Sequence, residues 1–492
     1  MVSINRILKD KDFISKLSLV FFFSISWLSI SSNYQNLLIF SSNESITVIQ
    51  ILNFFRTALN ILIFPILIFL FIKMLNEIDD FRFKKNLFFL IPLGYFICQI
   101  PALFYTTNSV ENLYYILSSL NLIMIMTLSV KIFKTNEILI LVYVTFIVLF
   151  MVLMITFFKD LINFIFNNGI GKKFYGSINT ILGENYIRSS GASRISLILL
   201  IIYSTVLMRC INSQILKTIP LFVFSTIVFL YESRAGVILL ILFIISSFLF
   251  NKKEFLKNIK KYLFFCIFFP FLCSIQINYL HSPASGNFRT AEELQVFKKH
   301  KELRLSEDRS TLSEDGSTLS EDGSTLSKDG TALKKIMPNI AFNFLCDVAK
   351  CNDKSQRILN KDKLLTTSGR IDDWKDLINQ FYNKGNNLIF GYGAQGDRYL
   401  INQTASNGIL YALSSSGVVG LLFFLIFSIA AGLHILKYFF TNRKNNTINH
   451  FSIFILLILG VRSLIESSYA LFGIDFILFY MSYALADKYN RI

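Results

Sequence analysis

Charged residues are scarce in this 492-residue chain, because Asp, Glu, Lys and Arg make up only 16% of it. Soluble domains carry about 25% charged residues, so the composition argues against an ordinary soluble protein. Cysteine and histidine are also few, six and four, and they show no zinc-site spacing. Walker A, HExxH, GxSxG and kinase patterns are absent, so the sequence predicts no metal and no cofactor. Cys346 and Cys351 lie in a long polar loop, either as a disulfide or as two free thiols.

Apolar residues, by contrast, make up 53% of the chain, and its mean hydropathy is +0.53. Long apolar runs recur along the sequence, and about 20 such residues cross a hydrocarbon core of roughly 30 Å as a helix. We therefore predict an all-α fold, a polytopic transmembrane helix bundle of about twelve spans. The predicted spans are 17–36, 48–72, 86–105, 113–133, 137–158, 193–210, 217–232, 235–250, 262–280, 408–436, 449–467 and 470–486.

The net charge of +16 is unevenly distributed. Loop 281–405 is nearly neutral, with 18 Lys/Arg against 17 Asp/Glu, whereas short segments 37–47 and 106–112 carry no basic residue. The remaining basic residues gather in alternate short loops, which is the positive-inside pattern of a membrane protein and not a nucleic-acid footprint. Both termini are then cytoplasmic, and three polar elements face outside: the 159–192 loop, the 232–236 turn and the 281–405 loop.

The long loop follows the ninth span and divides the chain into three parts. Residues 1–280 are predicted to form spans 1–9, residues 281–405 the extracytoplasmic loop, and residues 406–492 spans 10–12. Inside the loop, 305–332 repeats a seven-residue unit of the LSEDGST type. Each unit has one apolar residue where a coiled coil needs two, so we predict a flexible, solvated tract. Near 370–382, apolar residues recur at helical spacing, which predicts an amphipathic helix.

Arginines stand out at the predicted outer ends of the spans. Arg188 and Arg194 flank an SSGAS segment just before the sixth span, and Arg234 lies in a tight YESRAG turn. Arg370 and Arg398 lie in the long loop. A guanidinium binds a phosphate with two parallel hydrogen bonds, which makes these residues candidates for a phosphate site. Arg188 and Arg194 are equally open to snorkelling toward lipid headgroups.

Three other features have plainer interpretations. Arg462 and Glu466 are spaced as a structural i,i+4 ion pair in the eleventh span. The segment 391–396 matches GxGxxG, but no strand–helix–strand unit surrounds it, so we interpret it as a turn that requires positive φ. Asp372 and Asp373 are adjacent and point in different directions on a helix, so they cannot act as an acid–base pair.

Together these residues resemble the O-antigen ligase and polymerase family of integral membrane glycosyltransferases. The resemblance covers the span layout with its long loop after the ninth span, and four short motifs. Those motifs are Arg188 with the Gly191 region, Ser233-Arg234-Ala-Gly236, Gly369-Arg370…Trp374 before Gly391-Tyr-Gly393, and Ser406-Asn407-Gly408 with Gly417 and Gly420. Ligases of this family have a histidine where this chain has Ser406, so the polymerase branch is favoured and the ligase branch stays open.

The resemblance implies a metal-independent glycosyltransferase of the bacterial inner membrane, whose active site faces the periplasm. Its donor would be an undecaprenyl-diphosphate-linked oligosaccharide, and its acceptor another glycan lipid. A polymerase would extend O-antigen or a related surface polysaccharide, beside a flippase and a chain-length regulator, whereas a ligase would join the glycan to lipid A core. Arg188 and Arg234 are then expected to stabilise the leaving diphosphate, and Glu232 is a candidate proton acceptor. The expected substrate-binding residues are Arg370, Arg194, Ser406, Asn407 and Arg398.

Two other classes compete with this interpretation. A transporter or flippase of lipid-linked glycans suits twelve spans, but six-plus-six folds are expected to have their long loop at the midpoint. A metal-dependent lipid-donor glycosyltransferase is expected to have an acidic first external loop, whereas segment 37–47 has a single acidic residue, Glu44. A membrane scaffold explains the spans but not Arg234.

Overall fold

The computed structural model describes most of the apolar chain. The described residues are 11–29, 48–77, 87–106, 109–134, 137–166, 189–231, 233–250, 264–273, 370–383, 387–401, 404–440 and 447–491. The chain forms two compact units, one of residues 1–167, 172–276 and 367–492, the other of 168–171 and 277–366, and every described residue belongs to the first. The repeat tract at 305–332, Cys346 and Cys351 lie outside the described residues.

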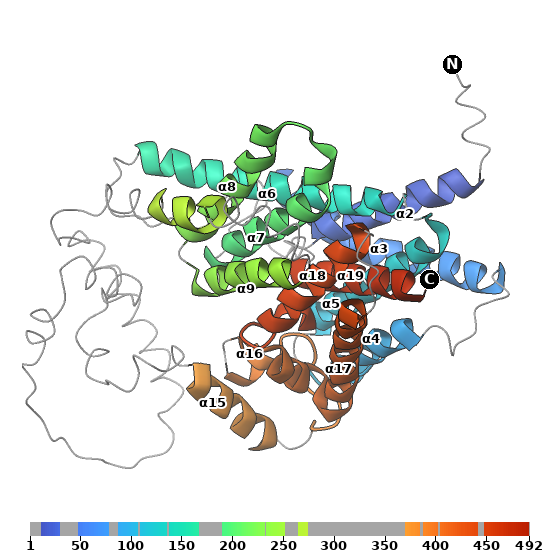
Figure 1. The fold of residues 1–492 in the computed structure, drawn as a ribbon. Coiled ribbons are helices and arrows are strands. Elements are labelled where there is room, and N and C mark those ends of the chain that lie inside the picture. The colour runs from blue at the N-terminus through green and yellow to red at the C-terminus, as the bar shows by residue number, and fades with distance from the viewer. Residues whose placement is uncertain are drawn as a thin grey trace, which may run out of the picture. The chain divides into compact units, whose positions relative to one another are not determined.

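The described residues fold as helices, with no strand among them, as the all-α prediction requires (Figure 1). The helices are α2 (Lys11–Leu28), α3 (Val48–Glu77), α4 (Leu87–Ile97), α5 (Ser109–Ile132), α6 (Leu139–Phe166), α7 (Ser189–Thr205), α8 (Gln214–Leu230), α9 (Arg234–Phe250), α15 (Arg370–Asn383), α16 (Gly396–Ile401), α17 (Gly408–Phe440), α18 (Thr447–Arg462) and α19 (Ile474–Arg491). Short helical turns are η4 (Ile100–Phe104), η5 (Leu207–Cys210), η6 (Phe264–Phe268) and η9 (Ser468–Ala470).

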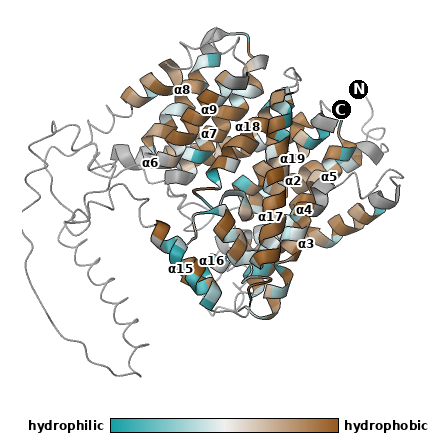
Figure 2. Ribbon diagram, turned by 60° about the horizontal axis from the view of Figure 1, so that its bottom comes forward, coloured by the Kyte–Doolittle hydropathy of each residue, from teal (hydrophilic) through white to brown (hydrophobic). Residues whose placement is uncertain are grey.

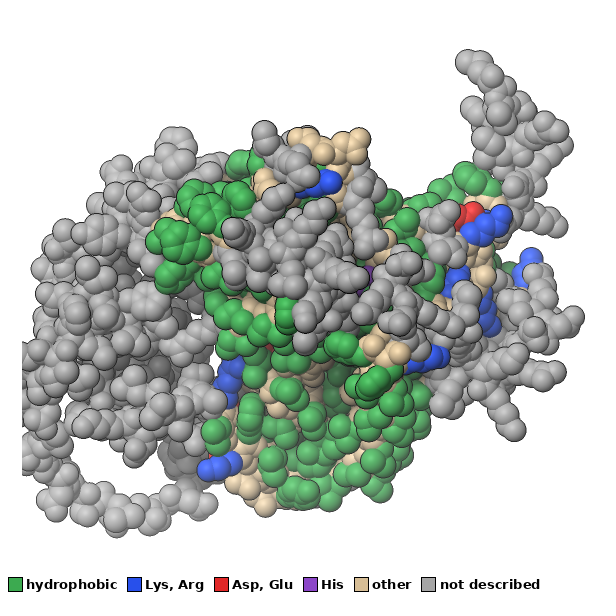
Figure 3. Space-filling model, viewed as in Figure 1, with side chains coloured by type: hydrophobic (Ala, Val, Ile, Leu, Met, Phe, Trp, Pro, Cys, Tyr) green, Lys and Arg blue, Asp and Glu red, His purple; other side chains and the backbone are tan. Residues whose placement is uncertain are grey.

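Among the described residues, three helical segments are long and apolar enough to cross a membrane: Ser109–Ile132, Leu139–Phe158 and Gly408–Phe440. Shorter apolar helices overlap the other predicted spans except 470–486, so the full twelve-span arrangement stays a prediction. Large apolar side chains point outward along these helices, as Phe69 and Ile429 do with 68% and 62% exposure (Figure 3). Such a surface suits a lipid environment and would be a liability in water.

Helix α19 lies in the middle of the bundle, where it packs against α18, α5 and α17. Every residue from Asp475 to Asp487 is buried. A helix that is apolar around most of its circumference must be covered on all sides, and the sequence from Phe476 to Ala486 meets this condition. The acidic side chain at the start of α19 is therefore held deep in the protein.

Helix α17 is interrupted at Gly417, whose φ and ψ are 64° and −165°. Segment 387–393 crosses this break and replaces the missing helical hydrogen bonds. The amides of Tyr392 and Gly393 donate to the carbonyl oxygens of Ser414 and Ser415, both at 2.8 Å. Backbone groups in an apolar bundle need partners inside the protein, so the crossing segment makes the break tolerable.

The crossing needs glycine on both sides. A Cβ on Gly417 would lie 2.3 Å from the carbonyl oxygen of Ile389, and one on Gly391 would lie 2.5 Å from the amide nitrogen of Gly417. Gly391 and Gly393 have φ values of 69° and 80°, so the predicted positive-φ turn is confirmed. The GxGxxG match therefore reflects a turn whose backbone packs closely against that of α17.

Helix α15 occupies Arg370–Asn383, where the sequence analysis expects an amphipathic helix, and it shows both hydrophilic and hydrophobic residues in Figure 2. Its buried side includes Leu377 and Phe381, while Lys375 and Asp376 are exposed. It packs against α16 and α17 in the same compact unit as the bundle. The last part of the predicted long loop is thereby fixed on the helices that follow it.

Candidate functional site

Three arginines and two carboxylates gather where α7, α15, α18 and α19 meet; we call Arg194, Arg370, Arg462, Glu466 and Asp475 the arginine cluster. Asp475 is at its centre, with a side chain that is 2% exposed. Arg462 forms an ion pair and a hydrogen bond with Asp475 Oδ2. The Nη1 atom of Arg194 lies 3.2 Å from Oδ1 of the same carboxylate. One buried acid thus holds guanidinium groups from two helices.

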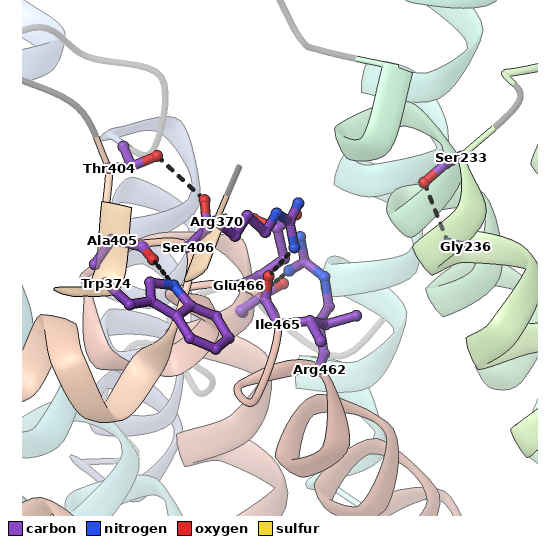
Figure 4. Close-up of polar contacts among 11 residues, drawn as sticks. Ser233, Gly236, Arg370, Trp374, Thr404, Ala405, Ser406, Arg462, Ile465 and Glu466 are labelled. Atoms are coloured by element: carbon purple, nitrogen blue, oxygen red, sulfur yellow. Dashed lines mark hydrogen bonds and ion pairs between the residues drawn. The ribbon is translucent and has the colours of Figure 1, made fainter. Parts of the chain in front are cut away.

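Arg370 forms the outer edge of the arginine cluster. It donates from Nη1 to the carbonyl oxygen of Ile465 at 2.6 Å, and its Nη2 lies 3.4 Å from Glu466 Oε1 (Figure 4). The side chains of Arg370 and Glu466 are 32% and 24% exposed, so solvent reaches this pair. The predicted Arg462–Glu466 pairing is wrong, because α18 ends at Arg462 and each residue takes a different partner.

The arginine cluster has one positive charge in excess, since three guanidinium groups face two carboxylates. The Nε atom of Arg194 is buried and has no hydrogen-bond partner among the described residues. A buried donor without a partner is costly, which leaves this guanidinium with unused capacity for an anion.

Two of the sequence motifs meet beside Arg194. Gly236, in the first turn of α9, packs so closely on α7 that an added Cβ would lie 1.9 Å from the Ser193 hydroxyl oxygen. The Ser233 hydroxyl accepts a hydrogen bond from the Gly236 amide at 3.2 Å and stabilises the same turn (Figure 4). The turn that carries Arg234 therefore touches the residue next to Arg194. Arg234 begins α9, but its side chain lies outside the described residues, as do Arg188 and Glu232.

Asn407 and Ser406 lie at the start of α17. Asn407 caps this helix, because its Oδ1 accepts hydrogen bonds from the amides of Ile409 and Leu410 at 2.9 and 3.1 Å. Its Nδ2 donates to the carbonyl oxygen of Leu464 at 3.0 Å, which ties the cap to the turn after α18. Ser406 has φ 47°, and its hydroxyl lies 3.5 Å from that of Thr404 (Figure 4). These contacts give Asn407 a positioning role next to the arginine cluster.

Arg398 lies outside the arginine cluster, and its side chain is exposed on α16. The neighbouring Asp397 is 1% exposed and accepts hydrogen bonds from the amides of Ala405 at 2.7 Å and Arg398 at 2.9 Å. Burial raises the pKa of the Asp397 carboxyl. Trp374 donates from its indole to the carbonyl oxygen of Ala405 at 2.7 Å (Figure 4). The Ala405 segment is therefore held from both sides.

The sequence analysis missed Asp475, the acid that organises the arginine cluster. Its position in the predicted twelfth span was the available signal, since a carboxylate at membrane depth needs a partner. Glu111 was missed as well, although it lies just before the predicted fourth span, in the segment 106–112 that carries no basic residue.

Within the described ranges, no three His, Cys, Asp or Glu side chains gather as a metal site would require. No family model matches the chain, and comparisons with curated proteins and with solved structures found no match either. The chemistry that the described site offers is that of guanidinium, carboxylate, amide and hydroxyl groups.

Proposed function

We propose that this chain is a glycosyltransferase of the bacterial inner membrane that polymerises repeat units of O-antigen or a related surface polysaccharide. Its donor is a glycan on undecaprenyl diphosphate. The observation that carries the proposal is the arginine cluster, with its excess positive charge at one end of an apolar helical bundle. A lipid-linked diphosphate has a matching form, an anionic headgroup on an apolar chain.

The reaction requires stabilisation of a leaving group. An acceptor hydroxyl attacks the anomeric carbon, the bond from that carbon to the phosphate oxygen breaks, and the lipid diphosphate leaves with the electron pair. Fixed cations that are already in place stabilise such developing charge strongly. Arg194 and Arg462 are held by Asp475 before substrate binds, while Arg370 is exposed enough to exchange Glu466 for a phosphate oxygen. Arg188 and Arg234 complete this proposed diphosphate site.

The sidedness of the bundle supports a periplasmic active site. The arginine cluster lies at the start of α19, whereas Lys488 lies near the opposite end of that helix and contacts the end of α5. Basic residues favour the cytoplasmic side of short loops, which puts the lysine end inside and the arginine cluster outside.

The test is surface-polysaccharide banding on gels from a deletion strain complemented with the wild-type chain or with Arg194→Ala. We expect loss of the long-chain ladder in the variant and a single repeat unit on the core. Lys488→Gln, at the other end of the bundle, is the control and should restore the ladder.

Two other banding patterns would change the assignment. Bare core with accumulated lipid-linked polymer indicates the ligase, which uses the same donor and joins its glycan to lipid A core. Bare core without any polymer indicates a flippase for lipid-linked glycans. Unchanged banding in the uncomplemented deletion strain contradicts all three functions.

A further inference from the structure

A second group of polar side chains lies where the start of α5 meets the turn before α16; we call Glu111, Asn112, Tyr115, Gln395 and Arg398 the amide–acid cluster. Gln395 donates from Nε2 to the Tyr115 hydroxyl at 3.2 Å. Gly393 lies directly against Asn112, since an added Cβ would be 2.4 Å from Asn112 Nδ2. Glu111 lies one helical turn before Tyr115 on α5, and Arg398 lies in the first turn of α16, three residues after Gln395. These groups therefore share one region although nearly 300 residues separate them in the sequence.

The turn that carries Gln395 is held in place by several contacts. The Tyr105 hydroxyl donates to the carbonyl oxygen of Gly391 at 2.5 Å, and the backbone amide of Gln395 donates to the Tyr411 hydroxyl at 3.0 Å. Gln395 itself has φ 65°, a left-handed conformation that is unfavourable for a non-glycine residue. Surrounding contacts impose this conformation, and it points to a fixed function for the turn.

The polar groups of the amide–acid cluster are incompletely used. Asn112 is 1% exposed, and its Oδ1 has no hydrogen-bond partner among the described residues. Glu111 is 9% exposed, and the described residues give its carboxylate neither an ion pair nor a hydrogen bond. Arg398 is exposed and likewise forms no ion pair within the described part. A carboxylate, two amides and a guanidinium with free capacity suit a ligand with several hydroxyl groups, such as a sugar ring.

We infer that Glu111, Asn112, Gln395 and Arg398 form the subsite for the acceptor sugar, and that Glu111 takes the proton of its attacking hydroxyl. This inference rests on the proposed function. In the transfer step, the hydroxyl oxygen bonds to the anomeric carbon of the donor while its proton moves to the Glu111 carboxylate. The bond from the anomeric carbon to phosphate breaks, and the diphosphate leaves with the electron pair. Glu111 then releases its proton to water.

The two clusters are joined through the Ala405 segment. Asp397, next to Arg398, accepts a hydrogen bond from the amide of Ala405 at 2.7 Å. Trp374, one helical turn after Arg370, donates to the carbonyl oxygen of the same residue at 2.7 Å. One residue thus links the helix that carries Arg370 to the helix that carries Arg398. A donor site at one cluster and an acceptor site at the other would share this support.

The test uses the full-length chain in lipid nanodiscs, with lipid-linked repeat units extracted from the deletion strain as substrate. We expect Glu111→Gln to lower the transfer rate by about 100-fold or more, the usual scale for loss of a general base. Binding of undecaprenyl diphosphate should stay within about twofold of the wild type, because the arginine cluster is intact. A carboxylate base makes the wild-type rate fall at acidic pH, as the carboxylate becomes protonated. Glu111→Asp should retain part of the activity and the same fall in rate, whereas Glu111→Gln should show no such fall.

Glu137→Gln provides a matched control, since it is the same substitution just beyond the other end of α5, and its transfer rate should equal the wild-type rate. Arg398→Gln keeps the test decisive if Glu111→Gln does not fold, because Arg398 is exposed. We expect it to raise the KM for the acceptor by about tenfold without changing binding of undecaprenyl diphosphate.

Three results would overturn the inference. They are wild-type transfer rates in Glu111→Gln, an unchanged acceptor KM in Arg398→Gln, and a parallel loss of undecaprenyl diphosphate binding in either variant. If the wild-type chain itself neither binds undecaprenyl diphosphate nor extends the repeat units, the proposed function fails and the inference fails with it.

Discussion

The two ends of the bundle hold their charges in different ways. Near the starts of α17 and α19, the arginine cluster draws its residues from α7, α15 and the region that joins α18 to α19, and its central carboxylate is buried. At the other end, Lys488 donates to the carbonyl oxygens of Val130 and Phe133 at 2.7 and 2.6 Å, next to the last turn of α5. Lys16 and Glu137 form a partly exposed ion pair there, with atoms 3.0 Å apart.

This difference separates a site from ordinary anchoring. Lysines near the end of a helix donate hydrogen bonds to its last carbonyl groups and interact favourably with the helix dipole. Many membrane helices are stabilised in this way. When guanidinium groups and a carboxylate are buried together, both kinds of group lose their hydration. Removing one partner then leaves an uncompensated charge. Burying the arginine cluster therefore lowers the stability of the fold, which indicates that the cluster is kept for a function. The lysine end carries no such cost.

Asp475→Asn should have the largest effect and would test the comparison directly. The change leaves Arg194 and Arg462 without their shared carboxylate, and breaking a buried ion pair costs about 3–5 kcal/mol. We expect a large fall in the thermal unfolding midpoint in detergent and loss of the polysaccharide ladder. A midpoint near that of the wild type would show that Asp475 does not hold the arginine cluster together.

Gly417→Ala should have an intermediate effect, because segment 387–393 crosses α17 at this residue. The new Cβ would meet the backbone of residue 389, and the positive φ adds strain, so we expect a loss of about 2 kcal/mol or more. Gly432→Ala in the same helix is the control, since an added Cβ there has nothing within 4 Å. Equal unfolding midpoints for the two variants would contradict the interrupted helix.

Glu137→Gln should have the smallest effect, and only through pH. The Lys134 amide and then Lys16 lower the pKa of this carboxyl, so its ionised form is favoured on folding. Its contribution is present above the ordinary Glu pKa of about 4.3 and is lost as the pH falls through the lower, folded value. The unfolding midpoints of wild type and variant should therefore differ slightly at pH 7 and converge once the pH falls below the lowered pKa of Glu137. A constant difference at all pH values would mean that the effect does not come from the charge.

Much of the fold could be predicted because apolar runs are a local property of the chain. The runs at 48–72 and 408–436 fall within α3 and α17, which extend to Glu77 and Phe440. The helix expected at 17–36 instead ends at Leu28 after starting at Lys11, because apolar patterning locates a helix better than it locates the helix ends.

The site could be predicted only in part. Arg194, Arg370 and Asn407 were chosen from the sequence, and they lie in or beside the arginine cluster. The partner of Arg462 was wrong, because i,i+4 spacing considers only neighbours on one helix and Asp475 comes from the next helix. The resemblance to O-antigen enzymes adds an expectation for these residues that the gel experiment must decide.

The sequence by itself determined that this protein is made of apolar helices, because hydropathy acts over short stretches of chain, and its charge bias predicted which short loops share a side. It also determined the positive-φ glycine turn at 391–396. Only the tertiary structure decided which charges meet: Asp475 with two arginines, and Glu466 with Arg370. Ion pairs between helices depend on how those helices pack, and no spacing along the chain records that packing.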